Sequence, residues 1–492
     1  MQKNEYLKQI DTVIEKGAYK DNWASLSAHR TPTWYYRDKF GIFIHWGVYS
    51  VPAYGNEWYS RNMYIENSVE YRHHLETYGS HKDFGYKDFI PMFKGENFQA
   101  EKWTALFKEA GAKFVMPVAE HHDGFAMYDT EYNPWNAKAM GPCRDVLGEL
   151  KSACEKEGLT FCASTHRAEH FFFMNGGRTF DSDIRQGDYE DFYGPAFYDE
   201  KLGGDEPMTK TCDTVDEIGP SQEFLEDWLC RTCEIIDKYR PKILYFDWWI
   251  QNQAFKPYLK KLAAYYYNRA LEWGCEVTID YKHNAFVPGT ATYDVERGAL
   301  EGISPTPWQT DTAIGKLSWG YRKDNNYKSA YEIVTTLIDI VSKNGMLLLN
   351  VGPKPDGSIT EEERTTLLET GRWLKENGEG IYGTTCWRFY KEGEHQAKSG
   401  MFSEGDVAYT PEDFRFTYKP GIVYAFQMKP PAAKTLTLKS FPTYKGGYCI
   451  KNVSTLGTNL AENFSCDREG LHISLKNTGK PELPLCYKIE LE

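Results

Sequence analysis

Two carboxylates in this sequence follow strand-like segments, and a pair of carboxylates is enough to cleave a glycosidic bond. The stretch "KILYFDWWI" (242–250) runs from mostly apolar residues into Asp247, and "ATYDVE" (291–296) ends on Glu296. One such group attacks the anomeric carbon or activates water, while the other protonates the leaving oxygen. Trp248 and Trp249 follow Asp247 directly, and aromatic walls exclude water and fit the apolar face of a sugar. We therefore expect one shared pocket; the alternative is that each carboxylate pairs with a nearby cation or caps a turn.

A second motif, "EHHDGF" (120–125), raises the question of a metal ion because His121 and His122 are adjacent. Neighbouring side chains on a strand point to opposite faces, so the two histidines can share a metal only where the backbone bends. The sequence has no His-x-His or His-Glu-x-x-His pattern. We expect hydrogen bonds from these histidines to a substrate or to neighbours, and neither a metal nor a cofactor. Cys230 and Cys233 form a lone "CRTC" pair, which we interpret as ordinary thiols of a reducing compartment.

Eight short apolar runs would position these residues. They cover residues 39–46, 112–125, 159–166, 242–249, 275–280, 291–296, 306–314 and 346–353. Helical periodicity occurs between most of them, for example over 97–112 and 327–345, and predicts a (β/α)8 barrel. Little helix separates the sixth run from the seventh. Another helix is predicted near the start, over residues 4–17.

Several of these runs end on ionisable residues, namely His45, His121, His122, His166, Asp247, Asp280 and Glu296. In barrels of this kind the active site lies at the carboxyl ends of the strands. We therefore expect these side chains to face one site.

The pattern changes near residue 400. Short alternating segments, separated by turn residues, cover 413–429, 435–441, 471–477 and 486–492. We predict a catalytic barrel over residues 1–395 and a C-terminal antiparallel β-sandwich over residues 396–492. The aromatic and acidic stretch 171–197 is interpreted as an insertion after the third strand that covers or shapes the site.

Composition limits the partners. Lys and Arg total 57 against 70 Asp and Glu, a net charge of -13, and no basic tract is visible. Neither nucleic acid nor an anionic membrane surface is therefore an expected partner. The start of the chain has no apolar signal core, and no run of 18 apolar residues occurs. We expect a soluble protein, cytoplasmic as given, or secreted or periplasmic if a signal peptide has been removed.

Five motifs, in order, resemble the α-L-fucosidases of glycoside hydrolase family 29. They are "KFGIFIHWGVYSVPAYGNEWY" (39–59), "AEHHDGF" (119–125), "LYFDWW" (244–249), "LSWGYR" (317–322) and "NGMLLLNVGPKPDGSI" (344–359). The resemblance implies a retaining exo-glycosidase that releases terminal α-L-fucose from a fucosylated oligosaccharide or glycoconjugate.

The resemblance also implies roles for individual residues. Asp247 matches the family's nucleophile at the end of the fourth barrel strand. The positions that hold the fucose hydroxyls and ring match His45, Glu57, Trp58, His121 and His122. Tyr245 matches an aromatic sugar contact, and Trp248 or Trp249 is expected to form the apolar wall for the fucose methyl group.

The sequence departs from the family pattern at the acid/base. A Glu often follows a Trp shortly before "SWGY", but here Trp308 is followed by Gln309, which cannot protonate a leaving group. Glu296 in "TYDVERG" is the better match, with Glu301 and Asp294 as alternatives.

Two segments near the site depart as well. "DYKHN" (280–284) replaces a frequent Asp-Arg-Trp, so Lys282 takes over an arginine contact or the contact is lost. His166, Arg167 and Glu169 are expected near the pocket, without an assigned role.

Three other functions stay open on the sequence alone. An α-L-galactoside differs from a fucoside by one hydroxyl, which a hydrophobic wall rejects only weakly. A non-catalytic sugar-binding protein would keep the pocket but lack the chemistry, and Gln309 leaves room for it. A metal-dependent hydrolase is more distant, and unchanged activity in the presence of chelators would exclude it.

Overall fold

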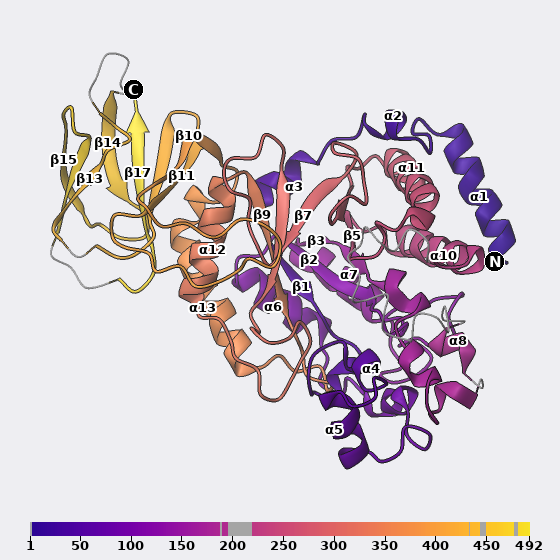
Figure 1. Cartoon of the computed structure of the whole chain (residues 1–492). Coiled ribbons are helices and arrows are strands. Elements are labelled where there is room, and N and C mark those ends of the chain that lie inside the picture. Colours follow the sequence, from indigo (N-terminus) through magenta and orange to yellow (C-terminus); the bar gives the residue numbers. More distant parts are fainter. Residues whose placement is uncertain (1, 187–188, 195–218, 432, 443–448, 477–480) are drawn as a thin grey trace.

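The computed structural model describes residues 2–186, 189–194, 219–431, 433–442, 449–476 and 481–492. A barrel of parallel strands occupies the centre of the molecule, and antiparallel sheets form its C-terminal end (Figure 1). The α-helices are α1 (Lys3–Lys16), α2 (Trp23–Leu26), α3 (Thr33–Asp38), α4 (Tyr59–Asn62), α5 (Val69–Thr77), α6 (Ala100–Glu109), α7 (Val146–Glu157), α8 (Glu190–Tyr193), α10 (Gln222–Tyr239), α11 (Lys256–Glu272), α12 (Ala330–Ser342) and α13 (Glu361–Asn377). The barrel strands are β1 (Phe40–Ile44), β2 (Phe114–Glu120), β3 (Thr160–Phe161), β4 (Ala163–Thr165), β5 (Ile243–Phe246), β6 (Thr278–Tyr281), β7 (Thr292–Glu296), β8 (Trp308–Ala313) and β9 (Gly345–Val351).

The central sheet closes on itself. Its strands are ordered β1-β9-β8-β7-β6-β5-β4-β2-β3, and β1 also pairs in parallel with β2. All eight predicted runs are strands, and the third is divided into β3 and β4 at Cys162. Gly41 on β1 leaves space for the Phe114 ring of β2, since a Cβ there would lie 2.1 Å from that ring. The predicted (β/α)8 barrel is confirmed.

The barrel interior is apolar on one side and acidic on the other. Phe43 on β1 and Leu348 on β9 belong to one buried apolar cluster. Asp280 on β6, Asp294 on β7 and Asp311 on β8 are buried as well. A carboxylate buried without a partner is strongly disfavoured. These acids therefore have to be paired with a cation or protonated.

Among the described residues, no helix connects β6 to β7 or β7 to β8. The connections 282–291 and 297–307, both described throughout, contain no helix. Ala397 and Met401 pack beside Val295 and Trp308, together with Ile340 of α12. We call residues 397–404 the linker segment; together with α12 it covers the outer surface of these strands.

The C-terminal part contains two antiparallel sheets. One has the order β10-β11-β12-β17-β14 and the other the order β13-β16-β15. The strands are β10 (Thr385–Glu392), β11 (Phe414–Lys419), β12 (Ile422–Gln427), β13 (Thr435–Leu438), β14 (Ile450–Thr455), β15 (Ala461–Cys466), β16 (Leu471–Leu475) and β17 (Leu485–Leu491). Side chains of both sheets, including Phe416 and Ile473, form one core, as in a β-sandwich. β10 precedes residue 395 and already belongs to the larger sheet, and the division of the chain at that residue stays a prediction.

The predicted N-terminal helix is α1. Its buried residues Tyr6, Ile10 and Ile14 pack into a cluster with α10 and α11, on the side of the barrel away from the C-terminal sheets (Figure 1). Within the described part of the chain, no helix combines the length and the apolar character needed to cross a membrane.

A buried ion pair joins the barrel to the C-terminal sheets and yields a first prediction. Arg415 Nε on β11 donates to Asp339 Oδ1 on α12 at 2.5 Å, and both side chains are almost fully buried. Asp339 also pairs with Lys343 Nζ at 2.7 Å, so Arg415→Met would remove one of the cations that compensate this buried carboxylate. Breaking a buried pair in this way is expected to lower the free energy of unfolding by about 3 kcal/mol in urea denaturation. The exposed pair Arg364–Glu361 supplies the control: Arg364→Met should change it by less than about 0.5 kcal/mol. Equal effects of the two variants would contradict the structural role of Arg415.

Candidate active site

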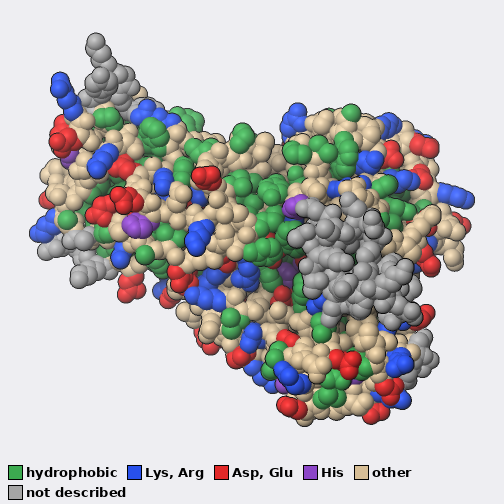
Figure 2. All heavy atoms as spheres, in the orientation of Figure 1, with side chains coloured by type: hydrophobic (Ala, Val, Ile, Leu, Met, Phe, Trp, Pro, Cys, Tyr) green, Lys and Arg blue, Asp and Glu red, His purple; other side chains and the backbone are tan. Residues whose placement is uncertain are grey.

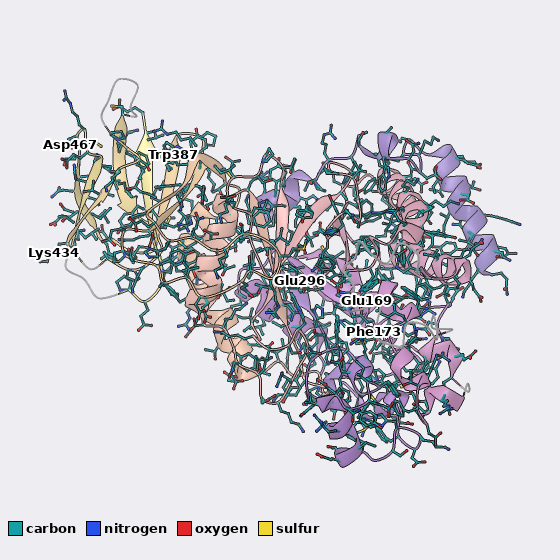
Figure 3. The ribbon with its side chains drawn as sticks, in the orientation of Figure 1. Glu169, Phe173, Glu296, Trp387, Lys434 and Asp467 are labelled. Atoms are coloured by element: carbon teal, nitrogen blue, oxygen red, sulfur yellow. The ribbon has the colours of Figure 1, made fainter. Side chains whose placement is uncertain are left out.

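A cavity of about 500 Å³ lies at the carboxyl ends of the barrel strands. It is lined by Phe43, His45, Asn56, Glu57, Trp58, His121, His122, His166, Glu169, Tyr245, Asp247, Trp248, Trp249, Glu296, Asp311, Trp319 and Phe402. All nine residues assigned to the site from the sequence are among them. Figure 3 shows two of the lining residues, Glu169 and Glu296, in the barrel part of the molecule, away from Trp387 in the C-terminal sheets.

Asp247 directly follows β5 and is held by three cationic or imidazole groups. Its Oδ2 lies 3.3 Å from His122 Nε2 and 3.2 Å from His166 Nδ1, and its Oδ1 lies 3.5 Å from Lys282 Nζ. Burial alone would raise the pKa of Asp247, but Lys282, His166 and His122 outweigh it and hold this pKa well below its usual range. Asp247 is therefore ionised.

Glu296 is the last residue of β7 and has the opposite electrostatic balance. Its Oε2 accepts hydrogen bonds from Trp248 Nε1 and Lys282 Nζ, both at 2.6 Å. Burial, followed by the charges of Asp247 and Asp311, raises the pKa of Glu296 to about 7, although Lys282 acts in the other direction. The two carboxylates thus have pKa values that lie far apart.

Lys282, in the segment that departs from the frequent Asp-Arg-Trp, lies between these carboxylates. Its buried ammonium contacts Asp247 and Glu296 and lies 3.3 Å from Asp311 Oδ2 and 3.6 Å from Asp294 Oδ2. Burial would lower the pKa of Lys282, but the surrounding acids raise it well above its usual value. Lys282 is therefore a permanent cation at the centre of an acidic cluster.

The histidines of "EHHDGF" both reach the cavity because β2 ends at Glu120 and the chain turns there. The ring centroids of His121 and His122 are 4.4 Å apart. Burial lowers the pKa of His121 well below its usual value, and His45, which forms a 2.6 Å hydrogen bond with Asn350, behaves in the same way. Burial would also lower the pKa of His122, but Glu169 and Asp247 raise it to about 9. Neutral and protonated imidazoles thus coexist in one cavity.

Two groups of side chains have the spacing of a metal site. The ligand atoms of His45, His121 and His166 lie within 4.8 Å of one another, and so do those of His122, His166 and Asp247. His166 belongs to both groups, so one ion at most can use it. The second group would also occupy Asp247. The expectation that no metal binds stays a prediction.

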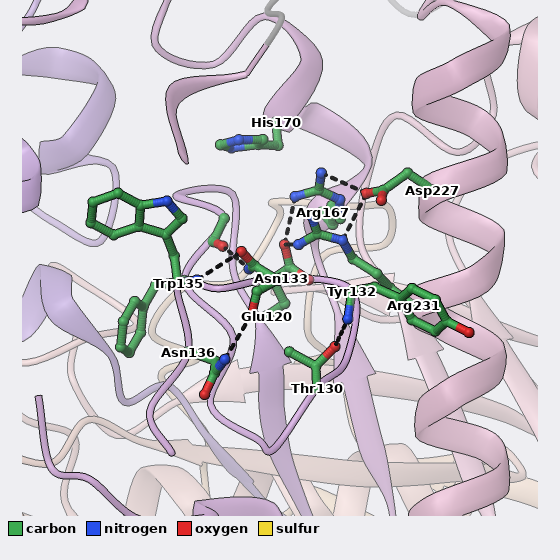
Figure 4. A network of polar contacts seen from close by, with 12 residues as sticks. Glu120, Thr130, Tyr132, Asn133, Trp135, Asn136, Arg167, His170, Asp227 and Arg231 are labelled. Atoms are coloured by element: carbon green, nitrogen blue, oxygen red, sulfur yellow. Dashed lines mark hydrogen bonds and ion pairs between the residues drawn. The ribbon is translucent and has the colours of Figure 1, made fainter. Parts of the chain in front are cut away.

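A buried charge network supports the turns that carry the histidines (Figure 4). Glu120 accepts from Arg167 at 2.7 Å and from Arg231 at 3.2 Å. Asp227 on α10 binds the same two arginines, at 2.9 and 2.7 Å. Because Glu120 directly precedes His121 and Arg167 directly follows His166, the network fixes both turns relative to α10.

The motif "NEWY" contributes three of the residues that line the cavity, Asn56, Glu57 and Trp58. Glu57 accepts from Ser318 Oγ and from the backbone N–H of Trp319, each at 2.9 Å, which ties it to "LSWGYR". Trp58 packs edge-on against His122 and Phe173. Phe173 comes from the stretch 171–197, whose residues 187–188 and 195–197 lie outside the described part of the chain. Phe173 thus packs against two residues that line the cavity but does not line it itself.

The two alternative acid/base residues lie elsewhere. Glu301 is exposed in the loop after β7 and does not line the cavity. Asp294 is fully buried inside the barrel, where it accepts from Gln309 Nε2 at 2.8 Å. Gln309, the departure from the family pattern, is likewise a buried barrel residue and not a cavity residue.

Sequence reasoning missed several lining residues. Asp311 follows Gln309 by two positions on the inward face of β8, so strand alternation was a usable signal for it. Its neighbour in the cavity, Tyr245, donates a 2.9 Å hydrogen bond to Asp311 Oδ2. Phe43 and Trp319 belong to matched motifs but were not singled out, and Phe402 had no signal, because it lies in the linker segment far along the chain.

A closed parallel barrel with two unlike carboxylates and aromatic walls at its carboxyl end defines a glycoside hydrolase of the barrel type. The family model described as alpha-L-fucosidase matches residues 6–379, and the chain belongs to that family.

Relatives of known name span most of the chain. It is 29% identical to plasma alpha-L-fucosidase of Homo sapiens over 489 residues, which cover 95% of this chain and 90% of that protein. Identity to tissue alpha-L-fucosidase of Rattus norvegicus is 30% over 381 residues, covering 76% of this chain and 74% of the relative. The structure of Thermotoga maritima alpha-fucosidase in complex with a mechanism-based inhibitor superposes with a TM-score of 0.74 at 29% identity, covering 96% of this chain and all of that one. The fucose complex of the same protein has a TM-score of 0.73, with the same identity and coverage.

The charge of His122 gives the second prediction. With a pKa near 9 it should stay protonated at pH 7, and Glu169→Gln should lower that pKa because one of the two carboxylates that raise it is neutralised. Because the folded-state pKa is raised, the stabilisation from this charge is fully present below about pH 6.5 and is lost as the pH rises towards 9. Histidine NMR titration, with His122→Gln to assign the signal, measures it. A midpoint at or below the ordinary histidine value would contradict the geometry.

Proposed function

We propose that this protein is a retaining exo-α-L-fucosidase that releases terminal fucose from a fucosylated oligosaccharide or glycoconjugate. The observation that carries the proposal is that Asp247 and Glu296 contact the same Lys282 ammonium, at 3.5 and 2.6 Å. These two contacts limit the separation of Asp247 Oδ1 and Glu296 Oε2 to about 6 Å, near the ~5–5.5 Å of retaining enzymes and below the ~6.5–9.5 Å of inverting ones.

In the first step Asp247 is the nucleophile. It is ionised, and it attacks the anomeric carbon while the bond from that carbon to the leaving oxygen breaks. Glu296 gives its proton to the leaving oxygen. Trp248 and Lys282 both donate to Glu296 Oε2, so Oε1 is the oxygen that carries the proton. A pKa near 7 keeps a large share of Glu296 protonated at neutral pH.

In the second step Glu296 acts as the base. It takes a proton from water, the water oxygen attacks the anomeric carbon, and the ester bond to Asp247 breaks. Esterification removes the negative charge of Asp247, which is one of the causes that raise the pKa of Glu296, while Lys282 keeps its charge. The pKa of Glu296 therefore falls in the intermediate, which suits a base.

Unsatisfied polar atoms support the binding of a polyhydroxylated ligand. Within the described residues, His121 Nδ1 and Asp311 Oδ1 are buried without a hydrogen-bond partner, and both residues line the cavity. Buried polar atoms normally have partners. We assign these two atoms to the hydroxyls of fucose, together with His45, Glu57 and His122, while Trp58, Tyr245 and Trp248 pack on the ligand. The Thermotoga relative has been solved in complex with fucose, which supports fucose as the class of ligand for this cavity.

The third prediction tests the nucleophile and the stereochemistry. Asp247→Ala should reduce turnover of an aryl fucoside by several orders of magnitude, because no covalent intermediate can form, and azide should restore part of it. NMR of the wild-type reaction should show the α-anomer of fucose as the first product, since two inversions retain configuration. Wild-type-like activity of the variant, or a β-anomer released first, is incompatible with the mechanism.

The fourth prediction identifies the acid. Protonation matters most for poor leaving groups, so Glu296→Ala should impair a fucosyl disaccharide far more than an activated aryl fucoside. In the wild type, kcat/KM for the disaccharide should fall above about pH 7 as Glu296 loses its proton, and the variant should lack that limb.

Glu301→Ala is the matched control, because it is an exposed carboxylate of the same loop region. It should affect both substrates mildly and equally. A selective loss on the disaccharide in Glu301→Ala, with none in Glu296→Ala, would transfer the role to Glu301.

A further inference from the structure

Phe402 is an exposed phenylalanine at the edge of the cavity. It lies in the linker segment, it is 61% exposed, and it lines the same cavity as Asp247 and Glu296. Its backbone φ is +54°, a conformation that a bulky residue adopts only at a cost in free energy. Strain of this kind concentrates at functional sites, where the surrounding structure enforces it.

The linker segment is fixed to the barrel on both sides of Phe402. The backbone N–H of Phe402 donates to the carbonyl of Glu296 at 2.8 Å, and that of Gly400 donates to Ala299 at 2.8 Å. The contact is close, because a Cβ on Gly298 would lie 1.9 Å from the Gly400 carbonyl oxygen. The ring of Phe402 is thereby held in place next to the acid/base.

Glu404 provides the second anchor. Its Oε1 accepts from Thr312 Oγ1 at 2.7 Å and from Lys328 Nζ at 2.5 Å, both on the barrel side. Ordering a mobile side chain during binding costs free energy, and a ring fixed in advance avoids much of that cost. Phe402 is therefore suited to contact a ligand and is not simply a solvent-facing residue of a loose loop.

The Phe402 ring faces Trp248. The two rings are nearly parallel, at 18°, with centroids 5.8 Å apart. A sugar between them would need about 7–8 Å, twice the ordinary contact distance, so the rings are an offset-stacked pair and not a clamp. Phe402 is 61% exposed, so a ligand can pack on the side of the pair that is open to solvent. Trp248 also donates to Glu296, so this surface lies beside the carboxyl group that protonates the leaving oxygen.

The surroundings of this surface are polar and electrically balanced. A second cavity of about 690 Å³ adjoins it, and Phe402 lines both. The charged residues lining the second cavity are four bases (Arg297, Lys316, Lys328, Lys398) and four acids (Glu332, Asp339, Glu404, Asp406). Figure 2 shows hydrophobic side chains gathered in the middle of the visible face, with charged side chains near them. A flat apolar face with a polar rim matches a neutral pyranose, which offers C–H groups on one face and hydroxyls at its edge.

The geometry points to Trp248 and Phe402 as the binding surface for the leaving group, and to a neutral pyranose sugar as that leaving group. This inference rests on the proposed function. It adds that the linker segment, which connects β10 to β11 of the larger C-terminal sheet, determines the selectivity for that sugar.

The test is a ratio of two substrates. α-L-Fucosyl fluoride has a leaving group too small to reach Phe402, whereas a fucosyl-galactose disaccharide places a pyranose there. Phe402→Ala is expected to lower the ratio of kcat/KM for the disaccharide to kcat/KM for the fluoride by about tenfold, the upper range for one aromatic contact. Phe402→Trp should preserve the ratio, because an aromatic ring remains.

Phe389→Ala is the matched control, since Phe389 is an exposed phenylalanine of β10 that does not line the cavity. It should leave the ratio unchanged. An unchanged ratio in Phe402→Ala overturns the inference, and so does an equal loss on both substrates, which would mean that Phe402 acts only by positioning Glu296. If Phe402→Ala lowers kcat/KM for n-octyl fucoside but not for the disaccharide, the inference of a sugar leaving group is overturned in favour of an apolar one.

The proposed function is tested separately by the wild-type enzyme. If the wild type releases no fucose from fucosyl fluoride, the proposed function itself fails. If it does so and the ratio is insensitive to Phe402, only the leaving-group surface is refuted.

Discussion

The site depends on one buried ammonium group and the carboxylates around it. Lys282 lies within 3.6 Å of Asp247, Asp294, Glu296 and Asp311. One cation cannot neutralise four anions in a buried setting, so part of the cluster has to be protonated. Burial and Asp311 raise the pKa of Asp294 well above its usual value, and the pKa of Glu296 is near 7, while that of Asp247 is held low. Competition for this lysine, together with the contacts of His166 and His122 with Asp247, thus makes one carboxylate ionised and another protonated within the same cavity.

The barrel has to be built to tolerate this cluster. Tyr35 donates a hydrogen bond to Asp280 at 2.9 Å, and Gln309 donates one to Asp294. Neutral donors thus bind Asp280, for which no contact with Lys282 is seen among the described residues, and Asp294, whose contact with Lys282 is long at 3.6 Å. The other side of the interior, around Phe43, is apolar and needs no such partners. Placing the charges on β6, β7 and β8 keeps them next to the strand ends that carry the chemistry. The barrel interior is therefore apolar on one side and charged on the other. The electrostatic potential in the cavity depends on these buried barrel residues as well as on the residues that line the cavity.

The fold could be predicted from the sequence because its signals are local. Each barrel strand is a short apolar run, and polar residues such as Asp247 stand at the strand ends by the geometry of the barrel. What could not be predicted depends on closure of the ring. Lys282 follows β6 and contacts Asp311 on β8, two strands that are separated by β7. Lys282 also lies in a segment that departs from the family motif, so its sequence position did not show which residues it contacts. Phe402 could not be predicted for a different reason, because the linker segment is irregular and has no helical or strand periodicity to detect.

The two halves of the cavity have different structural origins. The half that surrounds Asp247 consists of strand ends and adjoining loops of the barrel, including "EHHDGF" and "NEWY", and the buried network of Glu120 and Asp227 stiffens it. The other half includes Phe402, whose segment continues into the C-terminal sheets. Glu404, within that segment, pairs with Lys328, and Arg415, further along the chain, pairs with Asp339, so two ion pairs join this part of the chain to the barrel side. A change in how the sheets pack on α12 would therefore reach Phe402, and through its backbone Glu296, before it reached the groups that hold Asp247.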